Sequence, residues 1–377
     1  MLEGSRAVAM TIKNIGPDVV SAYPITPQTH IVEDLAQMKA DGECDFEYLR
    51  AESEFAAASI VLGASAAGVR VYSATSSQGL LLMTEVIHNI AGMRLPIVMT
   101  CANRAVSAPI NIWNDHSDVM SIKDAGFIQF FASDSQEAVN QHILAYKIAE
   151  KMNLPVMVNM DGYILTHSYE PVIVPSAKDI AKFLPAFKPE KGTYLDPKNP
   201  KTFGAFFPPA YYMETRLAIH ADMLKSLDLI KKEYALLNKI LSFNNKDNGL
   251  IEYIGPKSPK TIIIALGSIC GTILETLKSP KHNKSVGLLK IKTYRPFPRE
   301  EVRKVIARAQ NIAVCDRSIS FGQAGPVYND VCESAKGLKN NIKNYIVGLG
   351  GRDVTIKLIE KIINDAPKKN KNLQFYV

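Results

Sequence analysis

Cysteine is scarce in this sequence and is nowhere grouped as a metal site requires. The 377 residues contain five cysteines, and no two of them form a Cys-x-x-Cys pair or join a histidine cluster at ligand spacing. We therefore expect no metal site in this chain, neither zinc nor an iron–sulfur cluster. Cys101, Cys270 and Cys315 stand in or beside apolar runs, so we expect them to be buried thiols.

Long hydrophobic runs are also missing. The apolar run at 95–100 is far shorter than the roughly 20 residues that a membrane span needs. Residues 1–10 carry Glu3 and Arg6 inside a short apolar stretch, which lacks the order of charge, hydrophobic core and cleavage site of a signal peptide. We expect no membrane association, and a soluble protein of the cytoplasm.

The excess of positive charge is modest. Lys and Arg number 44 and Asp and Glu 37, which gives a net charge of +7. Nucleic-acid binding would need a basic face interleaved with stacking aromatics in a known module, and neither is present. We expect no nucleic-acid partner, although a weakly basic surface is suited to an acidic protein partner.

The rhythm of residues 1–168 predicts a first α/β domain. Continuous apolar runs alternate with helical patterns, and such strands predict a parallel sheet with helices on both faces. The strands are expected at 19–23, 46–49, 69–74, 96–102, 128–132 and 155–159, with helices at 27–40, 53–67, 79–91 and 136–152.

The rest of the chain predicts two further parts. Residues 169–257 combine many prolines and aromatics with a long helix at about 213–241. We expect this extended segment and its helix to pack on the first domain, because a solvated linker would not carry so many aromatics. Residues 258–377 resume the alternation and predict a second, smaller α/β domain, with strands at 261–266, 286–291, 312–315 and 345–348.

Polar residues gather where the first domain's strands end, which is where ligands of open α/β sheets bind. In the segment 23–29, Pro27 suits the first position of a helix and Thr26 suits its N-cap. The same helix N-terminus could hold a carboxylate or another anion. Residues 75–79 form a polar cluster between an apolar strand and an apolar helix, and capping accounts for only one of them.

Charged residues stand at two more of these strand ends. Glu52 and Glu54 begin an Ala-rich helix, where both complement its dipole. Glu54 could instead be partly desolvated and share a proton with a ligand nitrogen. Arg104 could anchor a loop through a salt bridge, or hold a small carboxylate in a bidentate pair. For His116, between two aspartates, we expect local hydrogen bonds within its loop.

Short motifs follow one another in a fixed order along both domains. The first domain carries Tyr-Pro-Ile-Thr-Pro, Glu-Ser-Glu, Thr-Ser-Ser-Gln-Gly-Leu, Asn-Arg-Ala, Asn-Asp-His-Ser-Asp-Val-Met and Asp-Gly with Thr-His, and the second carries Tyr-Arg-Pro-Phe-Pro, Asp-Arg-Ser-Ile-Ser-Phe-Gly and Gly-Leu-Gly-Gly-Arg-Asp. Each motif alone is weakly specific, but the order of all of them together is highly specific. This order resembles the alpha subunits of the pyruvate:ferredoxin oxidoreductase family, over essentially the whole chain.

The resemblance implies a fold and an activity. The fold would be the pyrimidine-binding module of thiamine-diphosphate enzymes, followed by a domain like the C-terminal domain of transketolase. The activity would be oxidative decarboxylation of pyruvate to acetyl-CoA and CO2, with coenzyme A as co-substrate and with electrons passed through iron–sulfur clusters to ferredoxin.

The resemblance also assigns roles to four residues. Glu54 matches the glutamate that hydrogen-bonds the aminopyrimidine ring nitrogen, which favours the tautomer able to remove the thiazolium proton. Thr26 and Arg104 match residues that contact the carboxylate and carbonyl of the substrate. Pro24 would shape the wall of the cofactor site.

Part of the family's machinery is absent from this sequence. Thiamine enzymes hold the diphosphate through a metal bound by Gly-Asp-Gly, and no Gly-Asp-Gly occurs here. The resemblance therefore implies a beta subunit that supplies the diphosphate and Mg2+ site and a 4Fe–4S cluster. Gamma and ferredoxin-like delta subunits are expected as further partners, so that this chain would provide only half of the active site.

Two other interpretations stay open. A sister enzyme of the family would act on 2-oxoisovalerate or 2-oxoglutarate, because Arg104 would recognise a carboxylate that all these substrates share. A non-catalytic scaffold subunit would keep the fold and only bind partners.

Overall fold

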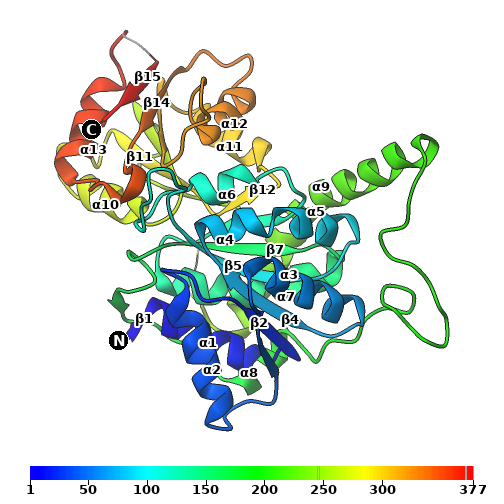
Figure 1. The fold of residues 1–377 in the computed structure, drawn as a ribbon. Coiled ribbons are helices and arrows are strands. Elements are labelled where there is room, and N and C mark those ends of the chain that lie inside the picture. Colours follow the sequence, from blue (N-terminus) through cyan, green and yellow to red (C-terminus); the bar gives the residue numbers. More distant parts are fainter. Residues whose placement is uncertain (244, 246, 370–371, 377) are drawn as a thin grey trace.

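The computed structural model describes residues 1–243, 245, 247–369 and 372–376. Two sheets, each covered by helices, form two adjoining domains, and a long arm projects from the first (Figure 1). Among the described residues, none of the helices combines the length and apolarity that a membrane crossing requires. The thiols of Cys101, Cys270 and Cys315 are buried and free, as expected.

The first sheet has seven strands in the order β12-β6-β7-β5-β4-β2-β3. All its neighbouring strands run parallel except β12, which pairs antiparallel with β6. Every residue of β4, β5 and β7 is buried, as continuous apolar strands covered on both faces require. The strands are β2 (Val19–Ala22), β3 (Glu47–Arg50), β4 (Val71–Thr75), β5 (Val98–Asn103), β6 (Ile128–Phe131), β7 (Val156–Asp161) and β12 (Thr293–Arg295).

Two groups of helices cover this sheet (Figure 1). One group contains α1 (Gly4–Ile15), α2 (Thr29–Ala40), α7 (Ser135–Met152), α8 (Ala177–Phe183) and the end of α9 (Pro209–Ile240). The other contains α3 (Glu54–Ala66), α4 (Ser77–Leu82), α5 (Thr84–Gly92) and α6 (Ser117–Ser121). A short antiparallel pair, β1 (Leu2–Glu3) with β8 (Tyr169–Glu170), joins the N-terminus to the segment after β7.

The second sheet has six strands in the order β15-β14-β13-β10-β11-β9. Of these described strands, only β9 is antiparallel to its neighbour. The strands are β9 (Ile251–Ile254), β10 (Thr261–Ala265), β11 (Val286–Ile291), β13 (Asn311–Asp316), β14 (Asn341–Ile346) and β15 (Leu373–Phe375). The helices are α10 (Ile269–Leu277), α11 (Arg299–Ile306), α12 (Pro326–Ser334) and α13 (Ile356–Asp365), with a 3-10 turn, η1 (Leu349–Gly351).

One strand on each side of the expected domain boundary at 257/258 belongs to the sheet of the other domain. β9 precedes residue 258 yet belongs to the second sheet, and β12 follows it yet extends the first. The backbone N–H groups of Lys292 and Thr293 donate to the carbonyl of Leu250, which ties the crossing points together. Antiparallel edge pairing of this kind leaves no composition signal in the sequence.

The segment 169–257 packs on the first domain only in part. α9 begins at Pro209, earlier than predicted, and only its later part packs on α7 and α8. The preceding extended arm touches the first domain at Leu195, whose N–H donates to the carbonyl of Ala66. Further along, Phe206 is 91% exposed and Tyr211 is 62% exposed. The arm and the start of α9 project outward (Figure 1). Their aromatic side chains are exposed.

Candidate functional site

The predicted site residues lie along one edge of the seven-stranded sheet. Thr26 follows β2, Glu54 follows β3 and Arg104 follows β5, while the polar cluster 75–79 follows β4. These four strands are neighbours in the order β5-β4-β2-β3 and run parallel. Their carboxyl ends therefore bring the four segments together, as the strand-end rule for open α/β sheets predicts.

The segment 23–29 differs from the expected helix start. α2 begins at Thr29, so Thr26 is not its N-cap and Pro27 is not its first residue. The reason is Gln28, whose side chain is buried: its Oε1 accepts from the N–H of Ile25, and its Nε2 donates to the carbonyl of Ala74. This side chain closes a turn before the helix and ties it to β4, which leaves Thr26 exposed.

Glu54 occupies the first position of α3 and is 8% exposed. Ser53, not Glu54, caps the helix, because its side chain accepts from the N–H of Ala56. Within the part of the chain that the structure describes, nothing hydrogen-bonds to the Glu54 carboxylate. The residue is largely buried while its carboxylate has no partner in the described chain, which leaves the carboxylate available to a ligand.

Gly79 makes the room that Glu54 occupies. A Cβ on Gly79 would stand 2.7 Å from Cγ and 2.8 Å from Oε1 of Glu54, and 2.6 Å from Oγ1 of Thr75. The hydroxyls of Thr75 and Ser76 are buried and have no partner among the described residues. Thus Glu54 and these hydroxyls form a polar cluster that the described part of the chain does not satisfy.

Arg104 is held at the end of β5 by backbone groups rather than by the salt bridge considered above. Its Nη1 donates to the carbonyl of Thr26 at 3.0 Å, and its Nε donates to the carbonyl of Asn111 at 3.0 Å. The side chain is 7% exposed. Two of its three nitrogens are therefore fixed, and Nη2 makes no hydrogen bond within the described residues.

Asp118 connects these segments and was not predicted as a site residue. One of its carboxylate oxygens accepts from the backbone N–H groups of Ser77 and Arg104, and the other from the side chain of Asn103. Complete burial raises the pKa of Asp118 to about 6, although these N–H donors lower it. In the sequence, Asp118 belongs to the Asn-Asp-His-Ser-Asp motif that follows Trp113. Nothing in that motif indicates that the Asp118 carboxylate contacts the ends of two strands.

His116 contributes to a network between the domains, not to local loop bonding as expected. Its ring Nε2 lies 2.8 Å from the carboxylate of Asp161 at the end of β7, and its backbone N–H donates to the carbonyl of Arg317. Arg317 and Ser268 of the second domain also donate to Asp161. Burial opposes ionisation of Asp161, but Arg317 and His116 outweigh it and lower its pKa. All four residues are buried or nearly so, and they join the two domains.

Two family models match most of the chain. Residues 10–235 match the model described as pyruvate flavodoxin/ferredoxin oxidoreductase, thiamine diphosphate-binding. Residues 260–359 match core domain II of pyruvate:ferredoxin oxidoreductase. The chain belongs to the pyruvate:ferredoxin oxidoreductase family. The resemblance and the fold class inferred from the sequence are confirmed, and residues 10–235 form the thiamine-diphosphate-binding domain of an enzyme subunit.

Relatives of similar length support the family assignment. The pyruvate synthase subunit PorA of Methanocaldococcus jannaschii is 46% identical over 100% of this chain and 97% of its own length. The PorA of Methanothermobacter thermautotrophicus is 42% identical over 96% of this chain and 94% of its own length. The ketoisovalerate oxidoreductase subunit VorA of Pyrococcus horikoshii is 38% identical over 98% of this chain and 93% of its own length.

A solved structure shares the fold. The 2-oxoglutarate:ferredoxin oxidoreductase of Magnetococcus marinus, determined with 2-oxoglutarate, coenzyme A and succinyl-CoA bound, superposes with a TM-score of 0.73. The two sequences are 20% identical. The match covers 97% of this chain and 64% of the longer Magnetococcus chain. At this identity the likeness shows the two-domain arrangement and not the substrate.

Proposed function

We propose that this chain is the alpha-type subunit of a pyruvate synthase and holds the aminopyrimidine side of thiamine diphosphate at the carboxyl edge of the seven-stranded sheet. The reaction would be oxidative decarboxylation of pyruvate to acetyl-CoA and CO2, with electrons passed to ferredoxin. The observation that carries the proposal is Glu54, a largely buried residue whose carboxylate has no partner in the described chain and fits against Gly79. The pyruvate synthase subunits of nearly equal length support it.

Glu54 suits the role of a hydrogen-bonding group for a ring nitrogen. Thiamine diphosphate supplies, when bound, the carbon nucleophile and the electron sink of the reaction. The carboxyl of Glu54 would hold a proton at the pyrimidine nitrogen, with the Thr75 hydroxyl as its neighbour. Pro24, half-buried after β2, would form the adjoining wall.

Arg104 and Thr26 suit the recognition of a 2-oxoacid. The carbonyl groups of Thr26 and Asn111 hold the guanidinium in place, and Nη2 is left to donate to a substrate carboxylate or carbonyl. Thr26, whose carbonyl holds this guanidinium, is itself exposed. A positioned cation of this kind orients the acid without spending conformational freedom on binding.

We propose that a second polypeptide covers this edge and completes the site. Large apolar side chains are exposed around it, among them Leu49 on the edge strand, Phe55 in α3 and Trp113 after Arg104. Clustered exposed apolar residues are typical of interfaces. A beta subunit would bring the diphosphate and Mg2+ site and a 4Fe–4S cluster, gamma and ferredoxin-like delta subunits would carry electrons to ferredoxin, and the assembly would be cytoplasmic.

One other 2-oxoacid, 2-oxoisovalerate, competes with pyruvate as the proposed substrate. Relatives named ketoisovalerate oxidoreductase subunits are 38% and 39% identical to this chain. A larger pocket for a branched side chain would favour 2-oxoisovalerate. Steady-state rates of the purified complex on pyruvate, 2-oxoisovalerate and 2-oxoglutarate decide between them, and comparable rates on all three would exclude the pyruvate assignment.

The role of Glu54 is tested by Glu54→Gln in the assembled complex. We expect kcat to fall at least about a hundredfold, the usual scale of a lost proton-transfer group. Glu52→Gln is the matched control, because Glu52 lies two residues away, just before α3, and is exposed, so the rate of this variant should not change. A Glu54→Gln complex with near-normal turnover would instead indicate a scaffold subunit.

A further inference from the structure

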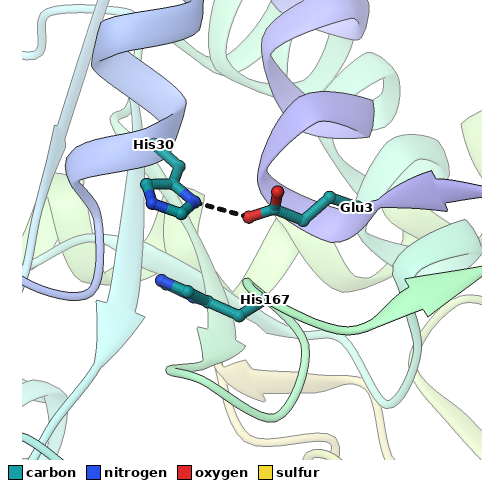
Figure 2. Close-up of side chains that lie close together, drawn as sticks. All are labelled: Glu3, His30 and His167. Atoms are coloured by element: carbon teal, nitrogen blue, oxygen red, sulfur yellow. Dashed lines mark hydrogen bonds and ion pairs between the residues drawn. The ribbon is translucent and has the colours of Figure 1, made fainter.

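Three potential metal ligands meet near the start of α2. Glu3 ends β1, His30 lies in the first turn of α2, and His167 lies in the loop between β7 and β8. Figure 2 shows the three side chains converging from these separate elements. One possible ligand atom from each lies within 4.8 Å of the other two.

The backbone holds Glu3 and His167 together. The N–H groups of Gly4 and Ser5 donate to the carbonyls of Ser168 and Thr166, which flank His167. The approach is so close that a Cβ on Gly4 would stand 1.9 Å from a backbone oxygen of the same loop. The relative positions of these two ligands are therefore fixed before any ion arrives.

Packing of α1 on α2 fixes the third ligand. Arg6 of α1 and Asp34 of α2 form an ion pair at 2.6 Å, one turn beyond His30. Nδ1 of His30 then lies 2.6 Å from Oε1 of Glu3. Glu3 occupies the N-cap position of α1, but its side chain makes no capping hydrogen bond, so its carboxylate is turned toward His30 instead.

The two imidazole rings lie close together. Their ring centroids are 4.4 Å apart. Nδ1 of His167 lies 2.7 Å from the hydroxyl of Thr166, which orients the ring and leaves Nε2 for a ligand.

We propose that Glu3, His30 and His167 bind one divalent transition-metal cation of the zinc class. Two imidazole nitrogens and one carboxylate oxygen are a ligand set of zinc and its neighbours, whereas calcium and magnesium prefer oxygen ligands alone. Bonds of about 2.0–2.2 Å place ligand atoms roughly 3.3 Å apart. Side-chain rotation would open the 2.6 Å contact between His30 and Glu3 to that distance and bring His167 to it. His30 is 46% exposed on its side chain, so an ion can enter from solvent.

The site has a structural consequence for the chain. The bound cation would clamp the N-terminus and α2 to the loop that follows β7. That loop reaches the proposed thiamine site, since the N–H of Gly162 donates to the carbonyl of Asn103 and a Cβ on Gly162 would meet Pro27 at 2.5 Å. The cation thus stiffens one wall of that site while taking no part in its chemistry. This departs from the expectation of no metal site, because ligands at positions 3, 30 and 167 have no spacing that a sequence motif can show.

The test is a Zn2+ titration of the full-length chain without an affinity tag, in competition with a chromophoric chelator. We expect about one saturable site per chain. His30→Gln and His167→Gln should each weaken it at least about tenfold, because even residues that only orient metal ligands contribute that much. Glu3→Gln, which keeps the side-chain shape, should weaken it as well.

His88→Gln and His220→Gln are the matched controls, since both histidines are exposed on other helices and should leave the affinity unchanged. Circular dichroism of the metal-free variants checks that they fold, and Zn2+ should raise the melting temperature of the wild type but not of the site variants. The proposal is overturned by the absence of saturable binding, by wild-type affinity in both site variants, or by an equal loss in the controls. None of these outcomes bears on Glu54→Gln, so the two proposals fail separately.

Discussion

The carboxyl edge of the seven-stranded sheet and the interface between the two domains both bury charged side chains, but they satisfy them differently. At the interface, Asp161 accepts from Arg317 and Ser268 and lies against His116, so its charge is compensated within the chain. At the sheet edge, Glu54 is buried without a hydrogen-bonding partner among the described residues. Buried polar groups are normally paired. The charge of Asp161 is paired within the chain, although Nε of Arg317 has no partner among the described residues, whereas the carboxylate of Glu54 is left for a ligand from outside.

The interface should therefore be the place where a charge change costs most stability. Asp161→Asn leaves the buried Arg317 without its counter-charge, and breaking a buried pair in this way costs about 3–5 kcal/mol. Urea unfolding of the isolated chain measures it. Asp228→Asn, at a side chain that is 87% exposed and pairs with Lys231, should cost less than about 1 kcal/mol. Equal effects of the two substitutions would remove the distinction between a sealed interface and an exposed surface.

Asp118 should give the sheet edge a distinctive dependence on pH. Its pKa is raised to about 6 by burial, above the value near 4 in an unfolded chain. The contribution of a carboxyl with a raised pKa is fully present below the unfolded value and is lost as the pH rises through the folded one. The stability difference between wild type and Asp118→Asn should therefore fall by up to about 3 kcal/mol between pH 4 and pH 7. A difference that stays constant over this range would contradict the burial of the charge.

The space beside Glu54 should be as important as Glu54 itself. Gly79→Ala places a Cβ within 2.8 Å of the Glu54 carboxylate and should displace it. We expect kcat of the complex to fall about a hundredfold, since a shift of about 1 Å in a positioned group has effects of that size. Gly63→Ala in α3 is the control, because nothing lies within 4 Å of its Cβ. Normal turnover in Gly79→Ala would show that the position of Glu54 is not critical.

Substitutions in the arm should have the smallest effect on stability. Phe206 is 91% exposed, so Phe206→Ser should change the stability of the isolated chain by less than about 0.5 kcal/mol. Phe183→Ser, at a residue of α8 that is 2% exposed, should cost several times more. Chemical unfolding of both variants measures this, and a large loss from Phe206→Ser would mean that the arm packs on the chain in solution.

Much of the fold and of the site edge could be predicted because it depends on local pattern. Continuous apolar strands alternating with helices gave the parallel sheet, and parallel strands bring their carboxyl ends to one edge. That is why the sequence alone groups Thr26, Glu54 and Arg104. Their roles toward the cofactor and the substrate remain predictions.

The rest could not be predicted because it depends on contacts between distant residues. Gln28 moves the start of α2 by bonding to β4, so the Thr26 cap was wrong. His116 finds its partners in β7 and in the second domain, and the strands β9 and β12 pair across the domain division. The aromatics of the arm were expected to be buried against the first domain. Composition alone does not say whether such side chains are buried within their own chain or against another polypeptide.

The central claim is that this chain holds one half of a thiamine-diphosphate site. It is tested most directly by calorimetric titration of thiamine diphosphate with Mg2+ into the isolated full-length chain and into the complete purified complex after removal of its cofactor. We predict that the isolated chain binds at least about a hundredfold more weakly, because it lacks the residues that hold the diphosphate. Equal affinity of the isolated chain and the complex would contradict the account.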